Sequence, residues 1–187
     1  FEEALSPLHA TGKLGVVVLQ FPSHFVPTKV NLEHLQDCRR MLGRYRVGVE
    51  LRNPEWFQRN NLGRLMGFLE RNDLMYIGVD GPQGLKTSVP PIAATFGDIC
   101  VVRFHGHNVH GWAMTGPNAK AERGNYRYSS VDLEPWVHKV RAIESRVDEV
   151  HLVMNTNYGG DGARLLADLL GEGIKQPLSL FSVERAS

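Results

Sequence analysis

An arginine and three histidines lie within eleven residues, in the stretch VVRFHGHNVHG over 101–111. Histidine can take up or release a proton near neutral pH, and arginine presents a rigid fork of N–H donors that suits a carboxylate or a phosphate. Along an extended strand, Arg103 and His105 have the same parity and point to the same side. We therefore expect this stretch to place an anion contact beside an acid–base group.

The same histidines allow two other interpretations. His105 and His107 have the H-x-H spacing of some metal-binding barrels, and His110 follows, but no Asp or Glu is interleaved with them. Alternatively, His107 and His110 belong to a solvated polar loop. We assign no metal site and name no cofactor from this pattern.

Five apolar runs predict the β-strands that position these residues. They cover 14–21, 46–51, 74–80, 98–104 and 149–155. Most are nearly continuously apolar and rich in valine and isoleucine, as in strands buried on both faces of a parallel sheet. Helical patterns lie between them, including a last one over 163–170, whereas the link over 81–97 has no clear helical period. This alternation predicts an α/β fold with parallel strands adjacent in chain order and joined by right-handed crossovers.

Polar residues follow every predicted strand. Functional groups of parallel α/β folds collect at the carboxyl ends of the strands. An unpaired buried polar group costs roughly 1–3 kcal/mol, so a protein without a site there would be more stable without them. The candidate catalytic residues are Glu50 or Asp80 as general base and His105 as proton donor. The candidate ligand-binding residues at this rim are Gln20, Arg52, Arg103, Trp112, Asn155 and Asn157. The alternative is that Glu50 and Arg52 belong to a structural network.

A long segment without clear periodicity, 108–130, follows the fourth predicted strand. Loops of this length in a compact domain are usually binding loops or lids. The region 103–128 contains four basic residues, Arg103, Lys120, Arg123 and Arg127, against one acidic residue, Glu122, and the aromatic residues Trp112, Tyr126 and Tyr128 are interleaved with them. This mixture suits an anionic ligand, a sugar phosphate or a nucleic-acid strand. We expect the segment to cover the carboxyl rim with Trp112 against it; the alternative is a solvated loop whose aromatic residues pack on their own barrel.

The composition is that of an ordinary globular protein. The 187 residues are 42% hydrophobic and 22% charged, with a formal net charge of +1. This charge gives no global basic field for nucleic acid. The chain has no run of about eighteen apolar residues, which predicts no membrane contact, and its start lacks the layout of a signal peptide. Cys38 and Cys100 fall in a helical and a strand pattern, which predicts reduced thiols in a cytoplasmic protein.

Five motifs in this order resemble the YecE-like family, known as domain of unknown function 72: LGVVVLQFP, VGVELRNPEWF, GVDGP, VVRFHG and MNTN. The resemblance covers essentially the whole chain. It implies a (β/α)8 TIM-type barrel of which five of the eight parallel strands are present here. Residues 1–187 would form a single domain, the C-terminal two-thirds of such a barrel, with about three N-terminal strands missing. Trp56 lies in the second motif and joins the candidate ligand-binding residues.

Three functions are consistent with these features. The leading hypothesis is a barrel protein that binds or transforms a small phosphorylated or carboxylated molecule, which Arg52 and Arg103 clamp at the rim. The alternative is a nucleic-acid-binding barrel with a phosphodiesterase-like or endonuclease-like activity, against which the net charge of +1 weighs. The third is a non-catalytic interaction protein. The resembled family has no established reaction, so the sequence decides neither whether the protein is an enzyme nor its oligomeric state.

Overall fold

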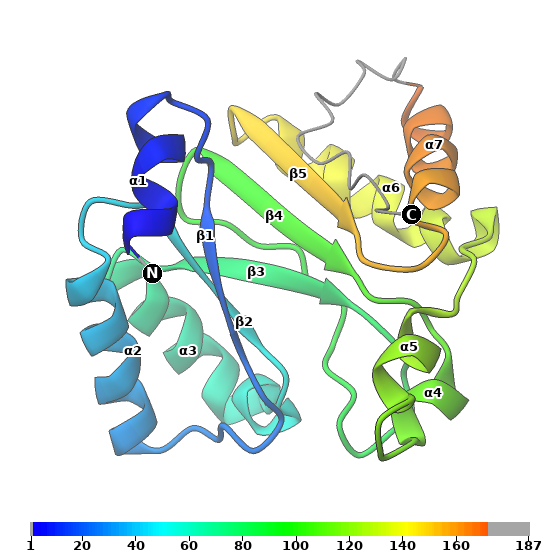
Figure 1. Cartoon of the computed structure of the whole chain (residues 1–187), viewed down its shortest axis with the longest axis horizontal. Coiled ribbons are helices and arrows are strands. Elements are labelled where there is room, and N and C mark those ends of the chain that lie inside the picture. Colours follow the sequence, from blue (N-terminus) through cyan, green and yellow to red (C-terminus); the bar gives the residue numbers. More distant parts are fainter. Residues whose placement is uncertain (1, 172–187) are drawn as a thin grey trace, which may run out of the picture.

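The computed structural model describes residues 2–171, which contain one five-stranded parallel sheet (Figure 1). The strands are β1 (Val17–Phe21), β2 (Val47–Leu51), β3 (Met75–Asp80), β4 (Ile99–Phe104) and β5 (Glu149–Met154). Every neighbouring pair is parallel, and the order in the sheet is the order in the chain. The prediction of five adjacent parallel strands is thereby confirmed.

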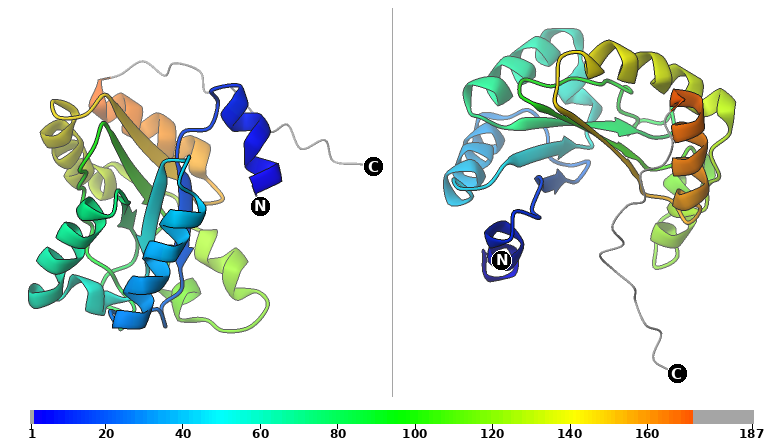
Figure 2. Two further views of the ribbon diagram at one scale, coloured as in Figure 1. Left: turned by 90° about the vertical axis from the view of Figure 1, so that its left-hand side faces the viewer. Right: turned by 90° about the horizontal axis from the view of Figure 1, so that it is seen from above.

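Four of the long helices cover the convex side of this curved sheet. The longer ones are α1 (Glu2–Ala10), α2 (Lys29–Met41), α3 (Arg59–Arg71), α6 (Ser130–Glu144) and α7 (Gly159–Leu170), and the shorter ones are the 3-10 turn η1 (Pro54–Phe57), α4 (Val109–Ala113) and α5 (Ala119–Gly124). Figure 2 shows α2, α3, α6 and α7 along the convex side of the sheet. The β3–β4 link contains no helix, as predicted. None of the helices within the described part of the chain has both the length and the apolar character to cross a membrane.

The two faces of the sheet are buried in different ways. On the convex face, α2 and α3 bury Leu35 and Leu69 against β1–β3, and α6 and α7 bury Trp136 and Leu166 against β4 and β5. On the concave face, a smaller cluster gathers around Ile77. Burial of the apolar convex layer provides most of the stabilisation, because hydrophobic free energy scales with the area removed from water.

Strand parity decides which face each side chain reaches. Ile77, Ile99 and Val101 cluster on the concave face, so odd-numbered residues of β3 and β4 point there. In β2 the even-numbered residues do so, because a Cβ added to Gly48 would lie 2.3 Å from Ile77 Cδ1. Glu50 has the parity of Gly48. Polar side chains at the carboxyl ends of the strands therefore point to both faces: Glu50 and Arg103 point to the concave face, and Asp80 points to the convex face.

Helix α7 begins four residues before the predicted 163–170. Three glycines near its start are poor helix formers, which hid this first turn from the sequence pattern. Gly159 is needed there because an added Cβ would lie 2.9 Å from the carbonyl oxygen of Met154. The helix ends as predicted, at Gly171 in the left-handed conformation.

Candidate functional site

A buried carboxylate lies at the centre of the concave rim. Glu50, at the end of β2, is fully buried. Its Oε2 accepts a hydrogen bond from Arg103 Nη1 at 2.6 Å, and its Oε1 accepts one from Arg52 Nη1 at 3.0 Å. Arg103 Nη1 also donates to Gln20 Oε1 at 3.2 Å. The structure therefore brings together Gln20, Glu50, Arg52 and Arg103, as the sequence predicted.

The charge of Glu50 is stabilised by its neighbours. Burial by itself would raise the pKa of Glu50, but the contact with His105 Nε2 and the charges of Arg52 and Arg103 outweigh it, so the pKa is lowered. The carboxylate is thus ionised at neutral pH, and both of its oxygens contact an arginine. This arrangement suits a fixed countercharge better than a general base that must take up a proton.

His105 and Asn155 extend the network from β4 to β5. His105 Nδ1 lies 3.0 Å from Asn155 Nδ2, and its Nε2 lies 3.1 Å from Glu50 Oε1 without a well-directed hydrogen bond. Because the amide of Asn155 donates to Nδ1, the ring proton belongs on Nε2. Burial lowers the pKa of His105, and the charges of Arg52 and Arg103 act in the same direction while Glu50 opposes them. His105 is therefore neutral at neutral pH.

Trp112 covers this network from the segment after β4. The guanidinium carbon of Arg52 lies 4.4 Å from the Trp112 ring centroid, and that of Arg123 lies 5.4 Å from it. The His105 ring is 6.3 Å away. In Figure 1, α4 and α5 lie beyond the carboxyl ends of β3 and β4. The prediction that the segment covers the rim and places Trp112 against it is confirmed.

The segment is more regular than the sequence predicted, because it contains α4 and α5. The Asn108 side chain caps α4 by accepting from the Gly111 amide at 3.0 Å, and its Nδ2 donates to the Glu122 carbonyl oxygen at 2.7 Å. A Cβ on Gly111 would lie 2.6 Å from the backbone of Glu122. Helices this short show no readable periodicity, and their order comes from this close packing. The structure does not describe the side chain of Lys120, one of the basic residues of this segment.

An open pocket of about 400 Å³ lies beside the network. Its lining residues are Gln20, Arg52, His105, Trp112, Arg123, Gly124, Met154, Asn155, Thr156 and Asn157. Three lining residues carry a polar atom that is shielded from solvent and has no hydrogen-bond partner: Trp112 Nε1, Arg123 Nε and Thr156 Oγ1. Each such atom costs stability unless something pairs with it. Among the residues predicted at the rim, the structure brings Asn155 and Asn157 to this pocket.

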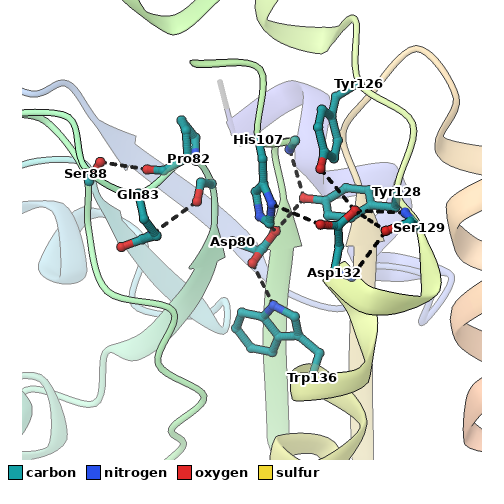
Figure 3. Close-up of polar contacts among 12 residues, drawn as sticks. Asp80, Pro82, Gln83, Ser88, His107, Tyr126, Tyr128, Ser129, Asp132 and Trp136 are labelled. Carbon is teal, nitrogen blue, oxygen red and sulfur yellow. Dashed lines mark hydrogen bonds and ion pairs between the residues drawn. The ribbon is translucent and has the colours of Figure 1, made fainter.

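Asp80 belongs to a separate network on the convex side (Figure 3). Its Oδ1 accepts from Trp136 Nε1 at 2.7 Å, and its Oδ2 accepts from the Tyr128 hydroxyl at 2.5 Å and lies 2.7 Å from His107 Nε2. In β3, Asp80 has the opposite parity to the residues of the concave face. The structure therefore does not bring Asp80 together with Glu50, and the role of general base predicted for it has no support from its position.

His107 links two carboxylates in this second network. Besides its contact with Asp80, its Nδ1 lies 3.7 Å from Asp132 Oδ1, and Asp132 Oδ2 accepts from the Tyr126 hydroxyl at 3.0 Å. The hydrogen bond to Asp80 raises the pKa of His107; burial opposes it, and the charges of Asp80 and Asp132 add to it. His107 is thus partly buried and held between two carboxylates, and the solvated-loop interpretation of it was wrong. Its position two residues beyond the strand gave no sign of these partners.

Trp56 lies outside the pocket. Its ring is buried and stacks on Phe25 with the ring centroids 5.8 Å apart, while Nε1 donates to the Phe25 carbonyl oxygen at 2.7 Å. The indole is fully used in packing, so the prediction that Trp56 contacts a ligand is not supported by the structure. Its motif instead fixes the turn after β2, which carries Arg52.

A metal site finds no further support. Across residues 2–171, no group of three or more His, Cys, Asp or Glu side chains lies close enough together to hold a metal ion. Cys38 and Cys100 are free thiols.

Gly106 permits the turn that leads from His105 into the rim segment. Its φ is +78°, and an added Cβ would lie 2.6 Å from Tyr126 Cβ. We expect Gly106→Ala to lower the free energy of unfolding by about 2–4 kcal/mol, from left-handed strain plus a steric clash. The matched control is Gly12→Ala, which has a φ of +67° and open space around it, so it isolates the strain. Urea unfolding that gives equal losses for the two variants would refute the close packing at Gly106.

The sheet and its rim define the class: a parallel α/β protein with polar groups gathered at the carboxyl ends of its strands. A family model described as "Protein of unknown function DUF72" matches residues 1–180, and the chain belongs to this family. The UPF0759 protein YunF of Bacillus subtilis (strain 168) is 31% identical over 187 residues, a match that covers 98% of this chain and 64% of YunF. The chain thus spans just under two thirds of this relative's length.

Two crystal structures share the fold. A DUF72 family protein from Enterococcus faecalis V583 has 28% sequence identity and a TM-score of 0.84, covering 97% of this chain and 68% of that one. A DUF72 family protein from Thermotoga maritima MSB8 has 27% identity and a TM-score of 0.79, covering 92% of this chain and 64% of that one. The family resemblance expected from the motifs is confirmed, and with it the α/β parallel sheet.

Proposed function

We propose that the concave rim pocket binds a small anionic molecule, phosphorylated or carboxylated, and that Arg52, Arg103 and Trp112 hold it. The observation that carries this proposal is the pair of arginines, Arg52 and Arg123, that line one pocket and both lie over the Trp112 ring, with Arg123 in no ion pair among the described residues. A structural network alone leaves the charge of Arg123 uncompensated, whereas an anionic ligand would pair with it.

We propose a division of roles within this site. Glu50 is the countercharge that keeps the two arginine forks in place, and Asn155 fixes the tautomer of His105. If the protein transforms its ligand, His105 is the group that exchanges a proton with it, because it is neutral at neutral pH and lines the pocket. The fully paired Glu50 does not take this role.

We further propose that the five strands form part of a (β/α)8 barrel. The strands are parallel and in chain order, the sheet is curved, and four of the long helices cover its convex side (Figure 2). The relatives, which are longer than this chain, leave room for additional strands. A site at the carboxyl ends of the strands is where barrels of this type carry their ligands.

The nucleic-acid alternative gains no comparable support. A sequence-tolerant nucleic-acid site stacks bases on exposed aromatic rings beside basic residues. Tyr128 is buried against Asp80, Tyr126 donates to Asp132, and Arg127 pairs with Asp161 at 2.7 Å. The aromatic and basic residues that suggested a strand-binding surface are thus mostly engaged within the protein.

Arg103→Lys tests the anion site, because it keeps the charge and removes the fork. We expect the affinity for inorganic phosphate to fall about tenfold, which corresponds to roughly one charge-assisted hydrogen bond. Thermal stability should change little, since lysine still neutralises Glu50. Isothermal titration calorimetry and thermal unfolding measure the two effects on the same samples.

The control for this variant is Arg46→Lys. Arg46 is an exposed arginine just before β2 that pairs with Asp98 at 2.8 Å, at the opposite end of the strands. It should leave phosphate affinity unchanged. A loss of stability in Arg103→Lys with unchanged phosphate binding would show that Arg103 is structural and would contradict its proposed role in holding a ligand.

A further inference from the structure

Three arginines gather at the rim, and two of them, Arg52 and Arg123, line the pocket. Arg52 and Arg103 both pair with Glu50, and Arg123 lies over Trp112 with no ion pair among the residues that the structure describes. The three guanidinium groups and the single carboxylate leave two positive charges uncompensated. A monoanion would neutralise only half of this excess.

The unpartnered groups of the pocket also favour one kind of hydrogen-bonding partner. The indole N–H of Trp112 and the guanidinium N–H of Arg123 are donors only, and the hydroxyl of Thr156 can donate. The carboxylate acceptor, Glu50, is already occupied by Arg52 and Arg103. A ligand that pairs with these donors therefore brings several acceptors. Neutral sugars donate as often as they accept, and a carboxylate brings two oxygens, whereas a phosphoryl group brings three strong acceptor oxygens.

We infer that the pocket takes a phosphomonoester in its dianionic form, with the phosphoryl group between Arg52 and Arg123 beside Trp112. This inference rests on the proposed anion site and names its substrate class. The pocket volume of about 400 Å³ exceeds the volume of a phosphoryl group, and Met154 adds an apolar wall, so the site has room for an organic remainder.

Methyl phosphate provides the test, because a phosphomonoester loses its second proton near pH 6. From pH 5 to pH 7.5 the dianion rises from about a tenth to nearly all of the ligand. Sulfate stays a dianion over this range and reports any titration of the protein itself. The groups that titrate near the site are His105, which faces Glu50, and His107, which faces Asp80, Asp132 and Tyr126. We expect the ratio of methyl phosphate affinity to sulfate affinity, from calorimetry, to rise about tenfold.

Arg123→Gln removes one of the uncompensated charges without touching Glu50. We expect methyl phosphate affinity at pH 7.5 to fall about tenfold and acetate affinity to fall less. Arg127→Gln is the matched control, because Arg127 lies on the same segment but is exposed and paired with Asp161. It should bind methyl phosphate as the unmodified protein does.

The outcomes separate this inference from the proposed function. If acetate or succinate binds as tightly as methyl phosphate, or if the affinity ratio to sulfate stays flat with pH, the phosphomonoester class is overturned while the anion site stands. If none of these anions binds, the anion site and the inference both fail. Selective loss of methyl phosphate binding in Arg123→Gln, and not in Arg127→Gln, supports the phosphoryl site.

Discussion

Replacing Glu50 with Gln is expected to lower the free energy of unfolding at pH 7 by about 3–5 kcal/mol, the cost of leaving a buried ion pair without one partner. The side chains of Arg52 and Arg103 are only 12% and 20% exposed, so water does not replace the lost carboxylate. For a domain of this size the melting temperature should fall by roughly 6–20 °C. The amide keeps the shape of the side chain, so the loss reports charge and not packing.

The effect of Glu50→Gln should depend on pH with a defined sign. The pKa of Glu50 is lowered in the folded protein, so its stabilising contribution is present above the pKa of the unfolded chain and is lost as pH falls through the folded pKa. The gap in stability between the two proteins should therefore be full at pH 7 and shrink below about pH 4. Urea unfolding between pH 3 and pH 8, a range chosen around the reference carboxyl pKa of about 4.3, measures this gap.

Glu50→Gln should change phosphate affinity in the opposite direction to stability. Without the Glu50 carboxylate, Arg52 and Arg103 lose their countercharge, so the folded variant should bind inorganic phosphate more tightly than the unmodified protein. Glu149→Gln is the control, because this carboxylate at the start of β5 is 58% exposed, and it should change stability by less than about 0.5 kcal/mol. A Glu50→Gln protein with unchanged stability and unchanged phosphate affinity would contradict the countercharge role.

Strand parity explains both the success and the failure of the sequence in locating the site. The shared parity of Arg103 and His105 placed them on one side, and the structure joins both to Glu50. Side chains also alternate between the two faces along the strand before Asp80. However, the apolar run MYIGV is buried on both faces, so it does not reveal whether even-numbered or odd-numbered residues point inward. The register, in which Asp80 lies opposite Phe104 and not Arg103, settles the face.

Other features depend on contacts that no local pattern contains. Trp56 is held by Phe25, which lies 31 residues away in the chain, and the order of α4 and α5 comes from Gly111 packing against Glu122. By contrast, the strands and the long helices follow from apolar runs and periodicity, because burial of their apolar faces is what stabilises them. Sequence reasoning therefore located the rim well and missed those side chains whose partners come from distant segments.

Replacing Asp80 with Asn is expected to lower the free energy of unfolding at pH 6.5 by about 3 kcal/mol. The carboxylate accepts from Trp136 and Tyr128 and faces His107, and an amide turns one of its two acceptor atoms into a donor. One of the three partner groups then faces an N–H₂ donor instead of an acceptor oxygen, in a buried position. Asp73→Asn, at a carboxylate 86% exposed, is the control and should be nearly neutral.

The pH dependence of Asp80→Asn follows from His107. Its pKa is raised in the folded protein, so this contribution is fully present below the unfolded value of about 6.5 and is lost as pH rises through the folded pKa. Removing the Asp80 charge removes the main cause of that shift. The unmodified protein should lose stability as pH rises through this window, the variant should lose less, and the NMR titration of the His107 ring should move to lower pH in the variant.

Anion binding by the folded Asp80→Asn variant distinguishes the two rim networks. Asp80 lies on the convex side with Trp136 and Tyr128, away from the pocket lined by Arg52 and Arg123. Phosphate affinity at pH 6.5, measured by calorimetry below the melting temperature of the variant, should therefore remain within about threefold of the unmodified protein, less than one charge-assisted hydrogen bond. A tenfold loss would place Asp80 in the binding machinery and restore the role that its position after β3 first suggested.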